Sequence, residues 1–352
     1  MKTPSALLLA SFLLLLLLGL ATHHAPAASR ANLHARMLVA SQDAHQNRHA
    51  SVWEPTLDAL VNPSKVFRML VSTPDVVWIP NFASHQGASY YNYSQLSSYT
   101  ANGTEFDDGQ MTLGAFAIPH QGFAEVSNFT VGGALIGWDG MLGLGSESHE
   151  PDCPSKLPFH SLVASGVLDE PLFAIYVNPL TRNGALTIGA TDTSRYTGEI
   201  VYADVVDPSM WMVAIGDIQV NGRSMTQLHR AEIAPEIGFL FGPEDEVGAL
   251  AKAVGASPMK DGYFRIDCST PGPDIEIVIA GARFVLTKSD YALRGGPTGD
   301  EREEECTLAF LGFAYDRWTF GLPFMQKVYT VFNWGDPQHD GRGRKVGFAV
   351  GN

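Results

Sequence analysis

Short runs of β-branched and aromatic residues recur along the chain, separated by Gly, Pro, Asn and Asp. Such runs predict strands, because these side chains fit a pleated, half-buried surface, and the separating residues favour turns. The predicted strands include 66–71, 76–79, 172–177, 185–188, 199–205, 211–220, 275–279, 283–286 and 328–332. Helical periodicity is confined to 159–164 and 244–254, where Pro243 precedes an acidic first turn. The pattern predicts an all-β fold with minor helices.

The first residues have the features of a secretory signal. Lys2 precedes an apolar run at 6–21, and the small residues Ala-Pro-Ala-Ala at 25–28 provide the kind of site that signal peptidase cleaves. A signal anchor is the alternative, but the run is short for a bilayer span and no basic cluster follows it. We expect residues 1–28 to be removed and the protein to be secreted, with no stable membrane span. Residues 29–52 hold little to bury, which predicts a flexible or pro-like extension.

The composition is typical of a packed, acidic protein. Apolar residues make up 45% of the chain, which is enough for a core, and 17% of residues are charged. There are 37 acidic and 23 basic side chains, for a formal charge of −14. Nucleic acid is therefore an unfavourable ligand, because phosphate binding needs a basic patch.

Three N-glycosylation sequons begin at Asn92, Asn102 and Asn128. Their clustering behind a signal peptide predicts at least one glycan, while ordinary turn asparagines are the alternative reading.

The chain contains three cysteines. In a secreted protein one pair should be bridged, and we pair Cys268 with Cys306, which bracket an acidic, Gly-rich loop. Cys153 is then free. It lies in a His-Glu-Pro-Asp-Cys run at 149–153, but no second ligand group stands at metal-binding spacing. The sequence predicts neither a metal nor a cofactor.

A weak internal repeat divides the chain into two parts. Residues 67–80 form a strand, a turn and a second hydrophobic strand, and residues 230–243 repeat this plan. A hydrophobic pair before a glycine follows each unit, within 138–145 and 318–324. Repetition at half the chain length indicates duplicated lobes. We expect an N-terminal lobe at 53–200 and a C-terminal lobe at 201–352.

Several segments resemble the pepsin-like aspartic proteases. Residues 139–145 read Asp-Gly-Met-Leu-Gly-Leu-Gly, close to the "DGILGLG" of that family. Residues 183–189 and 196–198 match its "GxLTLGGxDxxxYTG", and 329–332 and 346–349 match its closing "YTVFD…VGFA". The resemblance covers nearly all of the two expected lobes. It implies a bilobal fold of two β-rich lobes flanking a peptide-binding cleft, joined by a shared interlobe sheet that includes the last strands. The family's bridge in the C-terminal lobe also fits the Cys268–Cys306 spacing.

The resemblance fails at the positions that carry the family's chemistry. Two Asp-Thr/Ser-Gly loops, one from each lobe, bring together two carboxylates that share a proton and activate a water. Here residues 72–74 read Ser-Thr-Pro, and counting from Phe67 places Ser72 at the first aspartate position, although counting back from Trp78 gives Val71. In the second loop Ala234 replaces the aspartate, and Pro and Glu follow it. Neither Ser72 nor Ala234 can take a proton from water.

Displaced carboxylates near the expected cleft are the remaining source of acid–base chemistry. By this alignment they are Asp75, Asp107, Asp108 and Glu236. Solvated turn carboxylates are the simpler reading of all four. The family's flap tyrosine is also missing near 107–111.

The sequence thus favours a secreted, noncatalytic, monomeric glycoprotein of the pepsin-like fold that binds a polypeptide or partner protein in or around the cleft. The alternative from another class is an acidic endopeptidase that uses Asp75 or Glu236. A third reading is a poorly expressed pseudogene product or a faulty gene model.

Overall fold

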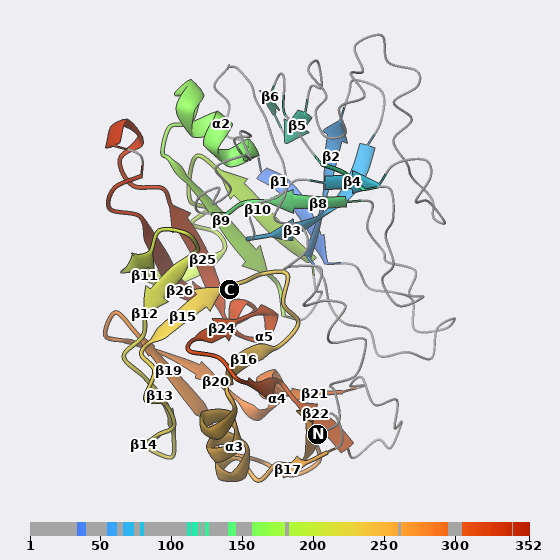
Figure 1. Ribbon diagram of the computed structural model, residues 1–352, viewed down its shortest axis with the longest axis vertical. Helices are drawn as coiled ribbons and strands as arrows, with labels where there is room; N and C mark the ends of the chain where they lie inside the picture. Colours follow the sequence, from blue (N-terminus) through green and yellow to red (C-terminus); the bar gives the residue numbers. More distant parts are fainter. Residues whose placement is uncertain are drawn as a thin grey trace.

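The computed structural model describes residues 34–39, 55–61, 66–73, 78–80, 111–113, 115–118, 121, 124–126, 140–145, 157–179, 183–259, 262–294, 305–339 and 341–352. These residues form one large mixed sheet system and two four-stranded sheets, with four α-helices in the described part (Figure 1). The predicted all-β fold with minor helices is therefore confirmed, and the arrangement is that of a bilobal pepsin-like protein.

The described residues of the N-terminal part form eleven strands and one helix. They are β1 (His34–Val39), β2 (Pro55–Val61), β3 (Val66–Ser72), β4 (Trp78–Pro80), β5 (Met111–Leu113), β6 (Phe116–Ile118), β7 (Ala124–Val126), β8 (Gly140–Gly143), α2 (Pro158–Ser165), β9 (Leu172–Val177), β10 (Asn183–Ile188) and β11 (Tyr196–Asp207). Helix α2 begins with Pro158 in its first turn and ends at Gly166, whose φ of 67° closes the helix.

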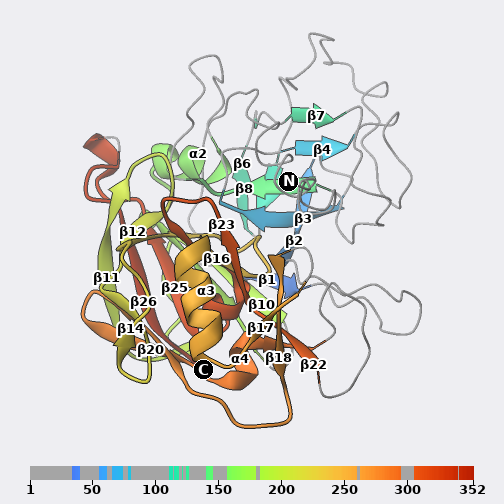
Figure 2. The ribbon, with the colours of Figure 1, turned by 60° about the horizontal axis from the view of Figure 1, so that its bottom comes forward.

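The C-terminal part contains the two four-stranded sheets and strands of the large one. Its elements are β12 (Met212–Ala214), β13 (Asp217–Val220), β14 (Arg223–Ser224), β15 (Arg230–Ile233), β16 (Leu240–Pro243), α3 (Glu244–Ala253), β17 (Ser257–Pro258), β18 (Phe264–Asp267), β19 (Ile275–Ile279), β20 (Ala282–Leu286), α4 (Lys288–Tyr291), β21 (Ala292–Leu293), β22 (Glu305–Leu308), β23 (Phe310–Phe313), β24 (Trp318–Phe320), α5 (Leu322–Met325), β25 (Val328–Asn333), the 3₁₀ turn Pro337–His339 and β26 (Lys345–Gly351). Helix α3 has three acidic residues in its first turn and packs on β16 and β23 (Figure 2).

A six-stranded part of the large sheet joins strands from both ends of the chain. Pairing runs from β1 through β10, β9, β25 and β26 to β11. Strand β9 is buried along its whole length because one face meets the main core and the other a small cluster around Tyr329. A strand covered on both faces reads as a continuous apolar run. Strand β11 spans the predicted boundary at 200/201, and the boundary itself stays a prediction.

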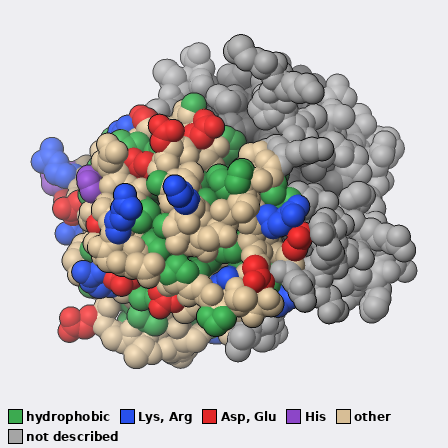
Figure 3. All heavy atoms as spheres, turned by 90° about the horizontal axis from the view of Figure 1, so that it is seen from below, with side chains coloured by type: hydrophobic (Ala, Val, Ile, Leu, Met, Phe, Trp, Pro, Cys, Tyr) green, Lys and Arg blue, Asp and Glu red, His purple; other side chains and the backbone are tan. Residues whose placement is uncertain are grey.

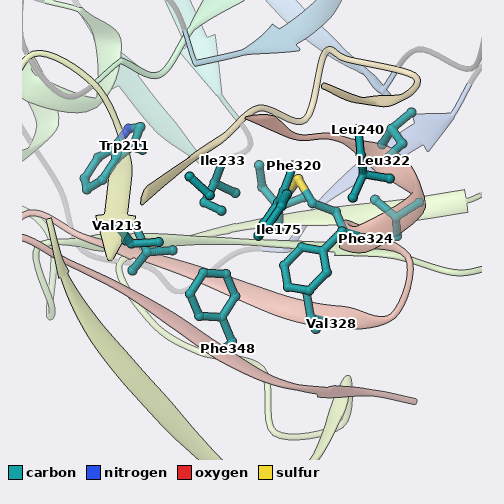
Figure 4. Close-up of a cluster of buried hydrophobic side chains, with 14 of the residues drawn as sticks. Ile175, Trp211, Val213, Ile233, Leu240, Phe320, Leu322, Phe324, Val328 and Phe348 are labelled. Carbon is teal, nitrogen blue, oxygen red and sulfur yellow. The ribbon is translucent and has the colours of Figure 1, made fainter. Parts of the chain in front are cut away.

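The main core is aromatic and is shared between the two parts. Phe173 stacks on Phe332 with ring centroids 4.6 Å apart, and Trp211 meets the same Phe332 ring edge-on at 5.2 Å. Figure 4 shows Trp211, Ile233, Phe320 and their apolar neighbours converging between the sheets. Offset and edge-to-face pairs of this kind add specific geometry to apolar burial.

Two segments differ in detail from the strands that the sequence pattern predicts. Within residues 29–52, for which the sequence predicts a flexible or pro-like extension, β1 pairs antiparallel with β10, from His34 with Thr187 to Leu38 with Asn183. The extension itself stays a prediction. A strand ladder is made by backbone groups, so a segment with little to bury can still join the edge of a sheet. The run 211–220 is two strands, because the chain leaves the large sheet at Gly216, whose N–H donates to the Val278 carbonyl at 2.7 Å.

The described surface has a mixed charge pattern. In the view of Figure 3, acidic and basic side chains are interspersed over the described part of the face. No helix in the described ranges is long and apolar enough to cross a bilayer.

Candidate functional site

The first half of the candidate site is a crossing of three strands in the N-terminal part. Strand β3 runs parallel to β8, so that Val71 lies opposite Leu142 and Ser72 opposite Gly143. Strand β4 meets β8 from the other side in the antiparallel sense, at Trp78 and Met141.

The second half repeats this crossing in the C-terminal part. Strand β15 runs parallel to β24, with Ile233 opposite Phe320, and β16 pairs with β24 in the antiparallel sense. Ala234 follows directly, and its N–H donates to the Phe320 carbonyl at 3.1 Å. Ala234 is 1% exposed. Figure 1 shows β15, β16 and β24 together below the corresponding strands of the N-terminal part.

The two registers support the alignment that pairs Ser72 with Ala234. In each half a parallel-paired strand ends where its partner reaches a glycine, Gly143 in the first and Gly321 in the second. Ser72 lies opposite Gly143. Ile233 lies opposite Phe320, so the next residue, Ala234, has the same position relative to Gly321. The alternative count to Val71 would place the two loops one residue out of step.

The two loops contact each other through Thr73 and Glu236. The Thr73 N–H donates to Glu236 Oε2 at 3.1 Å. The Thr73 hydroxyl lies 3.2 Å from Oε1 and 3.3 Å from Oε2. Both carboxyl oxygens are thus engaged by one residue of the other half. The prediction that Glu236 is a solvated turn carboxylate was wrong: it is partly buried in the contact between the halves.

The environment of Glu236 favours its neutral form. The pKa of Glu236 is raised to about 8, chiefly by burial and also by the charge of Glu232, while hydrogen bonds from its own backbone and from Thr73 lower it. Glu232 is itself paired with Arg317 at 3.1 Å. At neutral pH Glu236 is therefore largely a carboxylic acid, which both accepts and donates hydrogen bonds.

A second polar contact links the two parts beside this site. The indole Nε1–H of Trp211 donates to the Leu144 carbonyl at 2.8 Å, and Trp211 is fully buried. The sequence analysis missed this residue as well as Thr73. Thr73 had a usable signal, because it is the one position in the two Asp-Thr-Gly triplets where this chain keeps the family residue.

A model of the eukaryotic aspartyl protease family matches residues 76–340. This chain belongs to that family. The match includes Ala234 and begins just after residues 72–74, where the first motif is altered.

Curated relatives of the family cover most of the chain at low identity. Cathepsin D of Dictyostelium discoideum is 27% identical over an alignment of 321 residues, and the match covers 82% of this chain and 80% of that protein. Vacuolar protease A of Aspergillus fumigatus is 26% identical over an alignment of 347 residues, with coverages of 87% and 84%. Renin of Ovis aries is 24% identical over an alignment of 323 residues, with coverages of 82% and 78%. The predicted family is confirmed.

The structure also contains the disulfide predicted for this aspartyl protease family member. Cys268 follows β18, Cys306 lies in β22, and their Cα atoms are 5.6 Å apart. Because β18 and β22 are neighbours, with Ile266 opposite Cys306, the bridge reinforces an existing strand pair.

Other predicted positions lie outside the described residues. They are Asp75, Asp107, Asp108, Cys153 and the sequon residues Asn92, Asn102 and Asn128. Among the residues that the structure describes, no three His, Cys, Asp or Glu side chains gather as a metal site.

Proposed function

We propose that this chain is a secreted, noncatalytic member of the aspartyl protease family that binds a polypeptide or partner protein in or around the region between its lobes. The observation that carries the proposal is Ala234. A methyl group stands, fully buried, at the end of β15 where the alignment requires the second aspartate.

The family's reaction needs an acid and a base that act on the same water and peptide. Removing one such group lowers the rate about 10²–10⁴-fold. Ala234 has no ionisable group, and Ser72, at the equivalent position of the first half, has only a hydroxyl. With both aspartates replaced, no pair of carboxylates at these two positions can share a proton.

The retained fold supports a binding role. Extended peptides bind to strand-rich surfaces through main-chain hydrogen bonds, which do not require catalytic side chains. Secretion and glycosylation rest on the sequence alone, through the signal at 1–28 and the sequons at Asn92, Asn102 and Asn128.

The alternative function is acid proteolysis with Glu236 or Asp75 as a substitute acid. One observation supports this alternative, because Glu236 lies at the contact between the two halves. Against it, both Glu236 oxygens are already bonded to Thr73, so that a water or peptide would have to displace that contact.

Proteolysis is tested by incubating the purified chain with a denatured protein between about pH 2.5 and 6, with and without pepstatin. We expect no pepstatin-sensitive cleavage, since the general base is missing. Glu236→Gln and Asp75→Asn serve as matched variants. Pepstatin-sensitive cleavage that either variant abolishes would establish the alternative and remove the noncatalytic proposal.

Binding is tested separately with pepstatin as an extended peptide analogue, titrated by calorimetry at pH 4 and 7. We expect measurable binding without turnover. The binding role would be contradicted if neither pepstatin nor a panel of unfolded peptides gave a heat signal above that of buffer. This outcome is independent of the proteolysis result.

A further inference from the structure

The contact between Thr73 and Glu236 joins residues 163 positions apart in the chain. On one side it follows β3, and on the other it follows β15, the two strands that end in equivalent positions of the two halves. Thr73 is 5% exposed and Glu236 is partly buried, so water has limited access to the contact. It therefore ties the two halves together at the point where their loops meet.

The contact keeps its donors in both protonation states of Glu236. When neutral, the carboxyl accepts the Thr73 N–H at Oε2, and its own proton can be donated to the Thr73 hydroxyl 3.2 Å from Oε1. When ionised, it accepts from both Thr73 groups, but a desolvated charge is left in the contact. Burying a charge with no cation beside it costs more free energy than the additional hydrogen bond contributes.

The charged neighbours add to this cost. Glu232, on the same strand end, raises the pKa of Glu236, and its own partner is Arg317, 3.1 Å away just ahead of β24. Asp316 lies 3.9 Å from the same guanidinium. On the β3 side, Thr73 is the described residue that faces Glu236, and Asp75 lies outside the described part. Arg317 is thus shared between two other acids.

We propose that Thr73 and Glu236 form an acid-strengthened clasp, which holds the two halves of the molecule together in acidic solution and loosens when Glu236 loses its proton. The clasp follows from the described contacts and does not depend on the chain being noncatalytic. It gives a secretory-pathway protein a device by which compartment acidity sets how tightly its two halves are joined.

The sign of the effect follows from linkage. The pKa of Glu236 is raised in the folded state to about 8 from an ordinary value of 4.5. The folded protein therefore binds this proton more tightly than the unfolded chain does. The stabilisation is fully present below about pH 4.5 and is lost progressively as the pH rises to about 8.

The test compares the wild type with Glu236→Gln, which keeps the shape, an acceptor and an N–H donor but cannot ionise. Urea unfolding is measured from pH 4.5 to 8.5, together with hydrogen exchange at the Thr73 amide, corrected for its intrinsic rate. Glu199→Gln, on an exposed glutamate of β11, is the matched control.

In the wild type we expect the urea midpoint to fall as the pH rises, and the protection of the Thr73 amide to drop by about tenfold or more. In Glu236→Gln both should be nearly independent of pH in this window, while Glu199→Gln should follow the wild type. A wild type without the pH slope, or a Glu236→Gln variant that keeps it, would overturn the proposal.

Glu232→Gln is a second variant that tests the same device without touching the clasp. Removing its charge lowers the pKa of Glu236, so the upper end of the pH window should move to lower pH. An unchanged window would contradict the clasp even if Glu236→Gln failed to fold.

Discussion

Strands β3, β4 and β8 in the first half and β15, β16 and β24 in the second half cross in the same way, but the loops that they carry differ in chemistry. The first loop keeps Thr73, a residue that the family also has at this position. The second replaces its triplet by an apolar pair and Glu236. The crossing is held by backbone pairing and by a core that includes Ile233 and Phe320, and neither depends on catalytic carboxylates. The comparison teaches that both crossings are kept in a chain whose Ser72 and Ala234 carry no carboxylate.

Under the proposed alignment of Ser72 and Ala234 with the aspartate positions, the contact also lacks a repulsion between two carboxylates. Two acids placed side by side cannot both ionise without cost. In this chain a single carboxyl, Glu236, takes the contact and is satisfied by Thr73 across it. The second half therefore supplies the carboxyl group of this contact, and the first half supplies the hydrogen-bond donors.

The largest difference between the halves should appear when the disulfide is removed. The first half contains one cysteine, Cys153, and so has no internal bridge. Replacing Cys268 and Cys306 by Ser opens a loop of 38 residues, and we expect the C-terminal half to lose roughly 4 kcal/mol of unfolding free energy. Urea unfolding with hydrogen exchange resolved for β18, β22, β3 and β8 measures this loss. Cys153→Ser is the control, and an equal loss of protection in β3 and β8 would show that the halves unfold as one unit.

A smaller effect tests whether the two crossings are equally tight. A Cβ at Gly321 would lie 2.1 Å from the Ile237 carbonyl oxygen, so Gly321→Ala should cost about 3 kcal/mol through forced backbone shifts. If the halves are equivalent, Gly143→Ala should cost a similar amount. Gly248→Ala in α3, where no atom lies within 4 Å of the added methyl group, should instead stabilise the protein by roughly 0.5–1 kcal/mol.

Urea midpoints at constant slope measure all three glycine variants. If Gly321→Ala left the urea midpoint unchanged, the loop after Ala234 would be able to move away from the added methyl group. If only Gly143→Ala left the midpoint unchanged, the two crossings would not be equivalent.

The smallest expected loss of stability concerns the second link between the halves. Trp211→Phe removes the indole donor to the Leu144 carbonyl but keeps an aromatic ring, so we expect a loss of about 1–2 kcal/mol. Trp318→Phe is the matched variant, because its indole bonds to Thr226 and Glu246 within the C-terminal half. Hydrogen exchange should rise on both sides of the contact in the first variant and only in the C-terminal half in the second. The reverse distribution would contradict a linking role for Trp211.

Much of the fold could be predicted because it depends on local patterns. The continuous apolar run of β9 and the Pro243 start of α3 each carry their own signal, and both elements lie where the pattern placed them. The disulfide between Cys268 and Cys306 was also predictable, since three cysteines leave few pairings.

The missed features depend on what lies far away in the chain. Strand β1 has no strong pattern of its own and forms because the edge of β10 offers unpaired backbone groups. Glu236 looked like an ordinary turn acid because nothing in residues 230–243 reveals that Thr73 meets it. Only the folded arrangement of the two loops brings the donor to the acid.

The order β1, β10, β9, β25, β26, β11 places strands from the first and last parts of the chain side by side. Ile175 of β9 cannot pair with Thr330 of β25 until nearly the whole chain has been synthesised. Closing so long a loop is slow, because its entropy is lost before the contact forms. During synthesis the apolar strand β9 therefore keeps the backbone groups of one edge unpaired, which makes it a segment that we expect a chaperone to shield.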